Sequence, residues 1–214
     1  MHNQISRAFK VPFNGHENVT TNYAQAAQDL FVLSCLDGKR NGTFLDLGCH
    51  QPDFINNTFL LEKQFGWKGL SLDIDESCIQ RFPRVRKTPA LARDCTKLNW
   101  DEIFSHYSSK DIDYLSLDLE PADRTLQCLQ SVPFDKLNFS VITFEHDFYR
   151  FGEYYRTASR NIFNQAGYQL VSSDVKNGGA IYEDWYINPS KVDFERIKLL
   201  QTSNLEWSDV LFNS

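Results

Sequence analysis

The 214-residue sequence has few of the features that mark several common classes of protein. Its five cysteines, at positions 35, 49, 78, 95 and 128, are widely spaced and include no C-x-x-C pair. This pattern indicates neither a zinc knuckle nor a disulfide framework, and it fits a reducing compartment best. Basic residues are also few, with 22 Lys and Arg against 28 Asp and Glu. The net charge of −6 argues against a protein that coats nucleic acid through many phosphate contacts.

Long apolar runs are absent as well. No stretch approaches the ~20 apolar residues that span a bilayer. The first 20 residues contain no apolar targeting segment. We therefore expect a cytoplasmic protein without a membrane span. The chain also lacks the G-x-x-x-x-G-K-[ST] motif of P-loop nucleotidases and the G-x-S-x-G motif of serine hydrolases.

Short apolar runs alternate with segments of helical periodicity, which predicts βαβ units and a mostly parallel sheet with helices on both faces. We expect strands at 43–47, 69–74, 88–93, 112–119 and 138–145. We expect helices at 24–37, 76–82, 99–107, 122–131 and 153–166, and one that Asn56 or Asn57 caps and Gly66 ends. Strands at 168–173 and 180–187, joined by the turn signal VKNGG, form an antiparallel hairpin, and a helix follows at 190–202. We expect an irregular arm over 1–22 and a single domain over 23–214.

Acidic residues follow each predicted parallel strand, where ligands bind in sheets of this kind. Eight of the 28 acids fall there, namely Asp46, Asp73, Asp75, Asp94, Asp118, Glu120, Glu145 and Asp147. Asp is common in turns, and this preference explains any single one of these acids as well as a functional role does. The turn preference explains the presence of all eight acids at one edge less well.

The loop after the first strand distinguishes between cofactors. It reads GCHQPD from Gly48, whereas a dinucleotide-binding loop would read G-x-G-x-x-G. Asp53 stands at the third glycine position and would repel a pyrophosphate, but a carboxylate there tolerates a sulfonium. Asp73, at the end of the second strand, suits the two hydroxyls of a ribose, and Asp94 suits the amino group of adenine. These features favour S-adenosylmethionine over NAD.

The sequence resembles the FkbM-type methyltransferases. The resemblance rests on YAQAAQDLFV (23–32), FLDLGCHQPDFINNTFLLEKQFGWKGLSLDID (44–75), IDYLSLDLEPAD (112–123), FEHD (144–147), GYQLV (167–171) and EDWYINP (183–189). It implies the Rossmann-like class I methyltransferase fold, here α/β with a mostly parallel seven-stranded sheet, and methylation of hydroxyl oxygens on sugars or other small molecules. We expect cofactor contacts from Gln25, Asp46, Gly48, Cys49, His50, Asn57, Thr58, Asp73, Ile74, Asp94, Cys95, Asp118 and Leu119.

Methyl transfer to oxygen requires a group that takes the acceptor's proton. We predict His146, Asp118 and His50 as the catalytic residues, although each histidine also suits a structural hydrogen bond in its loop. A second hypothesis is that Asp118, Glu145 and His146 hold Mg²⁺ or another divalent cation, which would lower the pKa of the acceptor hydroxyl. The expected partner is a small hydroxylated acceptor such as a carbohydrate, and not nucleic acid.

Two other functions stay open. Pro121 replaces the family's glycine, fixes φ and lacks an N–H, which suits a catalytically silent binding protein with the same fold. An NAD-dependent oxidoreductase is disfavoured by the GCHQPD loop. The basic cluster Arg81, Arg84, Arg86 and Lys87 is expected to be a solvated turn, with a docking patch for an acidic glycan or lipid headgroup as the alternative.

Overall fold

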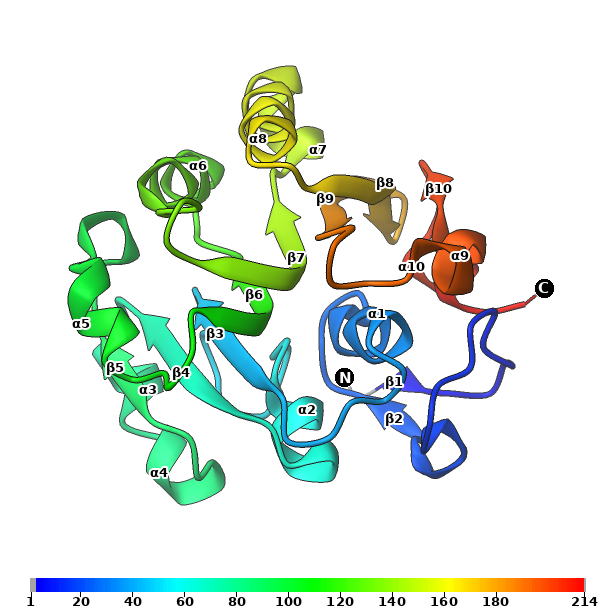
Figure 1. Ribbon diagram of the computed structural model, residues 1–214, viewed down its shortest axis with the longest axis horizontal. Coiled ribbons are helices and arrows are strands. Elements are labelled where there is room, and N and C mark those ends of the chain that lie inside the picture. The colour runs from blue at the N-terminus through cyan, green and yellow to red at the C-terminus, as the bar shows by residue number, and fades with distance from the viewer. Residues whose placement is uncertain (1–2, 214) are drawn as a thin grey trace.

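The computed structural model describes residues 3–213, and its centre is an eight-stranded sheet with helices on both faces (Figure 1). The strand order is β10-β8-β9-β7-β6-β3-β4-β5. The strands are β3 (Thr43–Leu47), β4 (Lys68–Asp73), β5 (Ala90–Ala92), β6 (Asp111–Leu117), β7 (Asn138–Glu145), β8 (Gln169–Asn177), β9 (Ala180–Ile187) and β10 (Thr202–Ser203). The strands from β5 to β7 are mutually parallel, and β9 runs antiparallel to both of its neighbours. The predicted fold class is therefore confirmed.

The helices lie between and beside these strands. The α-helices are α1 (Gln28–Cys35), α2 (Phe59–Phe65), α3 (Glu76–Ile79), α4 (Phe82–Val85), α5 (Trp100–Phe104), α6 (Ala122–Ser131), α7 (Phe148–Phe151), α8 (Glu153–Gln165), α9 (Phe194–Ile197) and α10 (Trp207–Leu211). Short 3₁₀ helices are η1 (His16–Asn18), η2 (Cys95–Lys97) and η3 (Lys198–Leu200).

Successive side chains of a central strand point to opposite faces of the sheet, and each face is covered by its own hydrophobic core. Phe44 and Tyr114 belong to the core on the side of α1 and α2, whereas Leu45 and Leu115 belong to the core on the side of α6 and α8. Figure 1 shows these two helical layers below and above the sheet. This explains why the strands read as continuous apolar runs in the sequence.

The C-terminal part of the sheet differs from the prediction. The helix expected over 190–202 is only α9 and η3, and Thr202 and Ser203 form an eighth strand that pairs in parallel with β8. The backbone of residues 202–203 therefore satisfies its polar groups through the sheet rather than through a helix.

Several predicted helix boundaries were also wrong. The first helix begins at Gln28 and not at residue 24, because Ala27 has a left-handed conformation with φ 59°. The cap of α2 is Thr58, whose N–H donates to Asn56 Oδ1. The helix expected over 76–82 is two short helices, α3 and α4, and Pro83 lies in the first turn of α4. Proline is tolerated there because that N–H has no helical partner.

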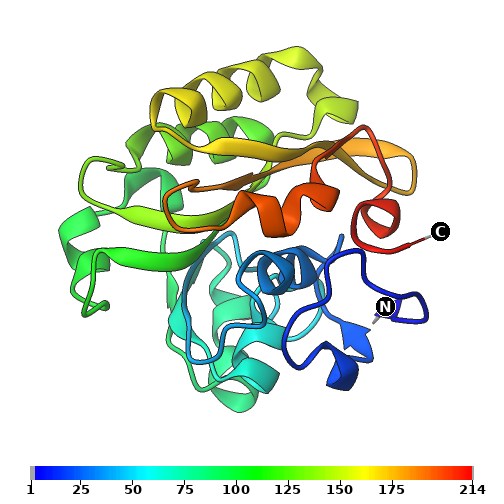
Figure 2. The ribbon, with the colours of Figure 1, turned by 45° about the vertical axis from the view of Figure 1, so that its right-hand side comes forward.

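The chain segment at residues 8–10 lies beside the C-terminal segment at residues 211–213 (Figure 2). Two short strands, β1 (Asn3–Gln4) and β2 (Thr21–Asn22), pair near the N-terminus, and residues 1–2 lie outside the described part. Phe9 is buried and forms a bridge with Phe212, and Lys10 N–H donates to the carbonyl of Leu211. Within residues 3–213, no helix is long and apolar enough to cross a membrane.

A buried carboxyl in α1 yields a prediction about pH. Burial raises the pKa of Asp29 from 3.8 to about 7. Between these values the folded protein holds a proton that the unfolded chain has lost, so stability falls as the pH rises. Relative to Asp29→Asn, we expect the wild-type free energy of unfolding to fall by about 1.4 kcal/mol per pH unit across that window and to level off above it. Urea unfolding of both proteins over a pH series measures this difference, and a constant difference would contradict the prediction.

Candidate functional site

A cavity of about 520 Å³ lies at the carboxyl ends of the parallel strands. Each of β3, β4, β5 and β6 delivers the residues that follow it to this cavity, because parallel strands end at the same edge of the sheet. Nine of the predicted cofactor residues line it, namely Gln25, Gly48, His50, Asp73, Ile74, Asp94, Cys95, Asp118 and Leu119. The structure therefore brings together residues that lie far apart in the sequence.

The loop after β3 is shaped by a glycine that no other residue can replace without strain. Gly48 has φ 89°, and a Cβ atom there would lie 1.8 Å from the carbonyl oxygen of Asp118. The backbone of Asp118, directly after β6, lies so close to Gly48 that only a glycine fits there. Two residues later, His50 N–H donates to Asp73 Oδ2 at 2.8 Å.

The carboxylate of Asp73 is held by the backbone on both oxygens. Oδ2 accepts from His50 N–H, and Oδ1 accepts from Asp75 N–H at 2.8 Å. A carboxylate offers about four lone-pair positions, so each oxygen keeps one for a ligand. Asp94 is fixed in a similar way, since its Oδ1 accepts from the N–H and the hydroxyl of Thr96. Both acids thus face the cavity in defined orientations.

Two further carboxyls lie side by side at the ends of β6 and β7. Burial raises the pKa of Asp118, and burial together with the charge of Asp118 raises the pKa of Glu145 well above its usual range. Asn57 Nδ2 donates to Asp118 Oδ2 at 3.5 Å and to Ser116 Oγ at 3.0 Å. Like charges this close cannot both ionise cheaply, so the pair favours holding one proton.

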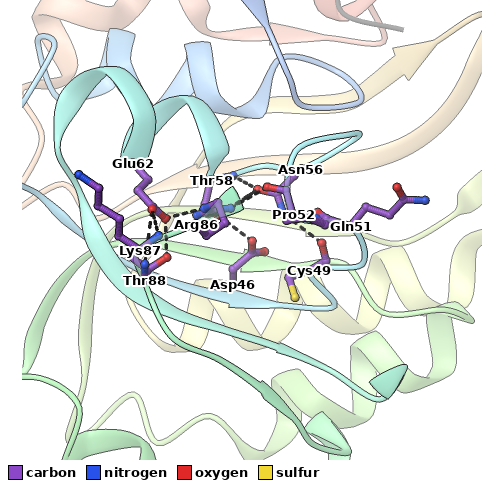
Figure 3. A network of polar contacts seen from close by, with 10 residues as sticks. All are labelled: Asp46, Cys49, Gln51, Pro52, Asn56, Thr58, Glu62, Arg86, Lys87 and Thr88. Carbon is purple, nitrogen blue, oxygen red and sulfur yellow. Dashed lines mark hydrogen bonds and ion pairs between the residues drawn. The ribbon is translucent and has the colours of Figure 1, made fainter. Parts of the chain in front are cut away.

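Beneath the loop lies a buried guanidinium, that of Arg86 (Figure 3). Its Nη1 donates to the carbonyl of Pro52 at 3.1 Å and to Asn56 Oδ1 at 3.0 Å. Its Nη2 donates to Thr58 Oγ1 at 3.1 Å. On the other side, its Nε donates to Glu62 Oε2 at 2.5 Å. One side chain from the connection between β4 and β5 therefore links the loop after β3 to α2.

The ionisation of the acids around Arg86 follows from this arrangement. Burial opposes the charge of Glu62, but Arg86 and the neighbouring hydrogen bonds hold its pKa below the usual range. Asp46, which accepts from Thr58 Oγ1 at 2.9 Å, is more deeply buried, and its pKa rises to about 6. Arg86 also lies 5.7 Å from the ring centroids of Phe44, Phe59 and Phe82. The expectation of a solvated basic turn is thus wrong for Arg86, which is 5% exposed.

Four of the predicted cofactor residues do not line the cavity. They are Asp46, Cys49, Asn57 and Thr58, and all are buried beneath it. Their hydrogen bonds go to the protein: Asn57 binds Asp118, Thr58 binds Asp46, and the carbonyl of Cys49 accepts from Asn56. They shape the loop and fix its acids.

His146 lies away from the cavity. Glu145 and His146 are successive residues at the end of β7, so their side chains point to opposite faces of the sheet. His146 is fully buried, with its Nε2 3.5 Å from Asp184 Oδ1, and Arg160 binds both oxygens of Asp184 at 2.7 and 2.8 Å. Burial opposes ionisation of Asp184, but the bonds from Arg160 and His146 hold its pKa below the usual range. This position does not favour the predicted catalytic role of His146.

The predicted metal ligands Asp118, Glu145 and His146 do not converge. Among residues 3–213, the ligand atoms that gather within 4.8 Å belong to two other groups, namely Glu120 with Glu145 and Asp147, and His146 with Asp174 and Asp184. Two carboxylates in each group are already paired with an arginine, since Arg150 binds Glu120 and Asp147 and Arg160 binds Asp174 and Asp184. The donor set therefore does not fit the predicted divalent cation.

The cavity also contains residues outside the predicted cofactor set. These are Ile55, Arg93, Thr96, Glu120, Pro121, Arg124, Glu145 and Tyr149. Most follow a strand end by a few residues, and that position alone could have indicated them. Ile55 and Tyr149 are 40% and 55% exposed, so they form an apolar rim at the mouth.

Solved structures resemble this arrangement. A proposed rRNA methylase from Clostridium thermocellum aligns with a TM-score of 0.52 at 12% identity, over 79% of this chain and 97% of that one. The magnesium protoporphyrin IX methyltransferase from Synechocystis PCC 6803, with bound SAM, gives 0.49 at 14% identity, over 76% and 77%. No family model matches this chain, and no curated protein matches it. The first alignment shows that the protein has the class I methyltransferase fold.

Removing the Arg86 guanidinium should destabilise the protein strongly. In Arg86→Met, Glu62 loses its cation and the loop after β3 loses three hydrogen bonds. Breaking a buried ion pair in this way costs about 3–5 kcal/mol. Urea unfolding tests this, with Arg84→Met as the matched control, because Arg84 is exposed and should change stability by no more than about 0.5 kcal/mol. Equal stability of the two variants would show that the network is energetically unimportant.

Proposed function

We propose that this protein is an S-adenosylmethionine-dependent methyltransferase of the FkbM type, which transfers a methyl group to a hydroxyl of a sugar or another small hydroxylated acceptor. The observation that carries the proposal is the carboxylate of Asp73 at the cavity. Its two oxygens are each fixed by one backbone N–H and each keep a lone pair, which matches the two hydroxyls of a ribose.

The charge of the cavity supports the same cofactor. Asp73, Asp94, Asp118, Glu120 and Glu145 line it. The arginines there are already paired: Arg93 lies 3.6 Å from Glu102, and Arg124 lies 3.9 Å from Asp94. An acidic cavity suits the sulfonium and ammonium groups of S-adenosylmethionine and repels a pyrophosphate. This disfavours a dinucleotide.

The bound cofactor supplies an electrophilic methyl group. In the transfer, the acceptor oxygen would form a bond to the methyl carbon as the C–S bond broke with its electron pair on sulfur. The hydroxyl proton must then pass to a protein group. Asp118 and His50, two of the predicted catalytic residues, line the cavity, and Glu145 lies beside Asp118. We assign the proton to the Asp118–Glu145 pair, with His50 at the mouth as the alternative. No step is assigned to a metal.

Cofactor binding tests the proposal. Titration calorimetry should show binding of S-adenosylmethionine and S-adenosylhomocysteine but not of NAD. Asp73→Asn removes a charge-assisted bond worth about 1.5–3 kcal/mol, so the affinity for S-adenosylhomocysteine should fall about ten- to hundredfold. Asp135→Asn, at an exposed position outside the cavity, is the matched control. Heat with NAD alone would favour an oxidoreductase and reject the proposal.

Turnover tests the acceptor class. With S-adenosylmethionine and a panel of sugars and other hydroxylated small molecules, we expect formation of S-adenosylhomocysteine and of a methyl ether, detected by mass spectrometry. A panel of amines and RNA oligonucleotides serves as the comparison. Binding without turnover on any acceptor would indicate a silent binding protein, and turnover on RNA alone would reject the small-molecule acceptor.

A further inference from the structure

A second cavity, of about 580 Å³, lies at the opposite edge of the sheet, where the strands begin. Thr43, Lys68 and Asp111 are the first residues of β3, β4 and β6, and all three line it. Lys87 and His106 line it from the connections before β5 and after α5. This cavity is separate from the proposed cofactor site, since the two share no lining residue.

The acids of the second cavity are already engaged. Glu62 accepts from Arg86 Nε at 2.5 Å, from Lys87 N–H at 2.6 Å and from the hydroxyl of Thr88. Asp111 forms an ion pair with Lys191 at 3.1 Å. Lys68 and Lys87, in contrast, are exposed, and within residues 3–213 neither ammonium group has an ion-pair partner. Counted together with Arg86 and Lys191, the partners of its two acids, the cavity has an excess of two positive charges in a chain whose net charge is −6.

The same cavity touches the network that holds the cofactor loop (Figure 3). Glu62 is one of the residues that line the cavity, and its Oε2 accepts from Arg86 Nε. Arg86 in turn binds Pro52, Asn56 and Thr58, in the loop that places Gly48 and His50. Lys87 follows Arg86 directly in the chain. A ligand that moves Lys87 or Glu62 thus acts on the group that fixes this loop.

We propose that the second cavity binds a small molecule with an oxyanion group, such as a phosphate ester, and that its binding alters cofactor affinity through Glu62 and Arg86. Lys68 and Lys87 supply the charge, and the hydroxyl of Ser108, on the cavity wall, supplies a hydrogen bond. The link to the cofactor rests on the proposed function, whereas the anion site does not. Such coupling is reciprocal, so the cofactor changes the affinity for the anion by the same factor.

An NMR titration tests the anion site. Inorganic phosphate is added to the ¹⁵N-labelled full chain, with sodium chloride at equal ionic strength as the reference. We expect saturable shifts at the amides of Lys68, Lys87 and Ser108 that chloride does not produce. In the double variant Lys68→Ala/Lys87→Ala the affinity should fall at least about tenfold, the effect of 1.4 kcal/mol. The control is Lys63→Ala/Lys136→Ala, which removes two exposed lysines outside the cavity.

Both substituted lysines are exposed, so the ¹⁵N spectrum of the double variant should stay dispersed. Shifts that do not saturate, or that are equal in the two double variants, overturn the anion site.

Calorimetry then tests the coupling. Phosphate should change the affinity for S-adenosylhomocysteine at least about fivefold, the lower end of typical couplings. In Glu62→Gln, which weakens the contact with Arg86, the change should disappear. An unchanged affinity in the wild-type protein overturns the regulatory part. If S-adenosylhomocysteine does not bind at all, the proposed function fails, and the NMR titration still decides the anion site.

Discussion

The buried guanidinium of Arg86 is the interaction on which the site depends. A charge without water is costly, and here the cost is offset by four acceptors, one of which is the carboxylate of Glu62, and by three aromatic rings. The acceptors come from the loop after β3 and from α2, so their positions are set relative to one another. Because Thr58 also binds Asp46 on β3, the network joins β3, the loop after it, α2 and the connection between β4 and β5.

The backbone at the cavity is positioned by close packing of the loop after β3 against the end of β6. Gly48 brings the loop after β3 against the end of β6, and no side chain would fit between them. The N–H of His50 then reaches Asp73 at the end of β4. The orientation of the acid that would receive a ribose is therefore a consequence of loop packing, and the packing is a consequence of Arg86 below it.

Electrostatics divides the acids of the sheet edge into two kinds. Asp73 and Asp94 accept backbone and hydroxyl bonds and remain available as acceptors. Asp118 and Glu145 are buried next to each other; burial raises the pKa of both, and the charge of Asp118 raises that of Glu145 further. Such a division suits a site that must bind a cationic cofactor and also take up a proton. Five of the 28 acidic residues thus line one cavity at one edge of the sheet.

The sequence by itself determined the alternation of strands and helices, the mostly parallel sheet with helices on both faces, and the edge at which the site lies, because apolar runs and turn residues report burial and chain reversal locally. It also identified nine residues of the cavity, since the residues after parallel strands share one edge. Only the tertiary structure decided that Arg86 is buried, that His146 faces away from the cavity and that Glu145 faces into it. These facts depend on which side of a strand each residue occupies and on contacts across 24 or more positions, and local patterns do not contain that information.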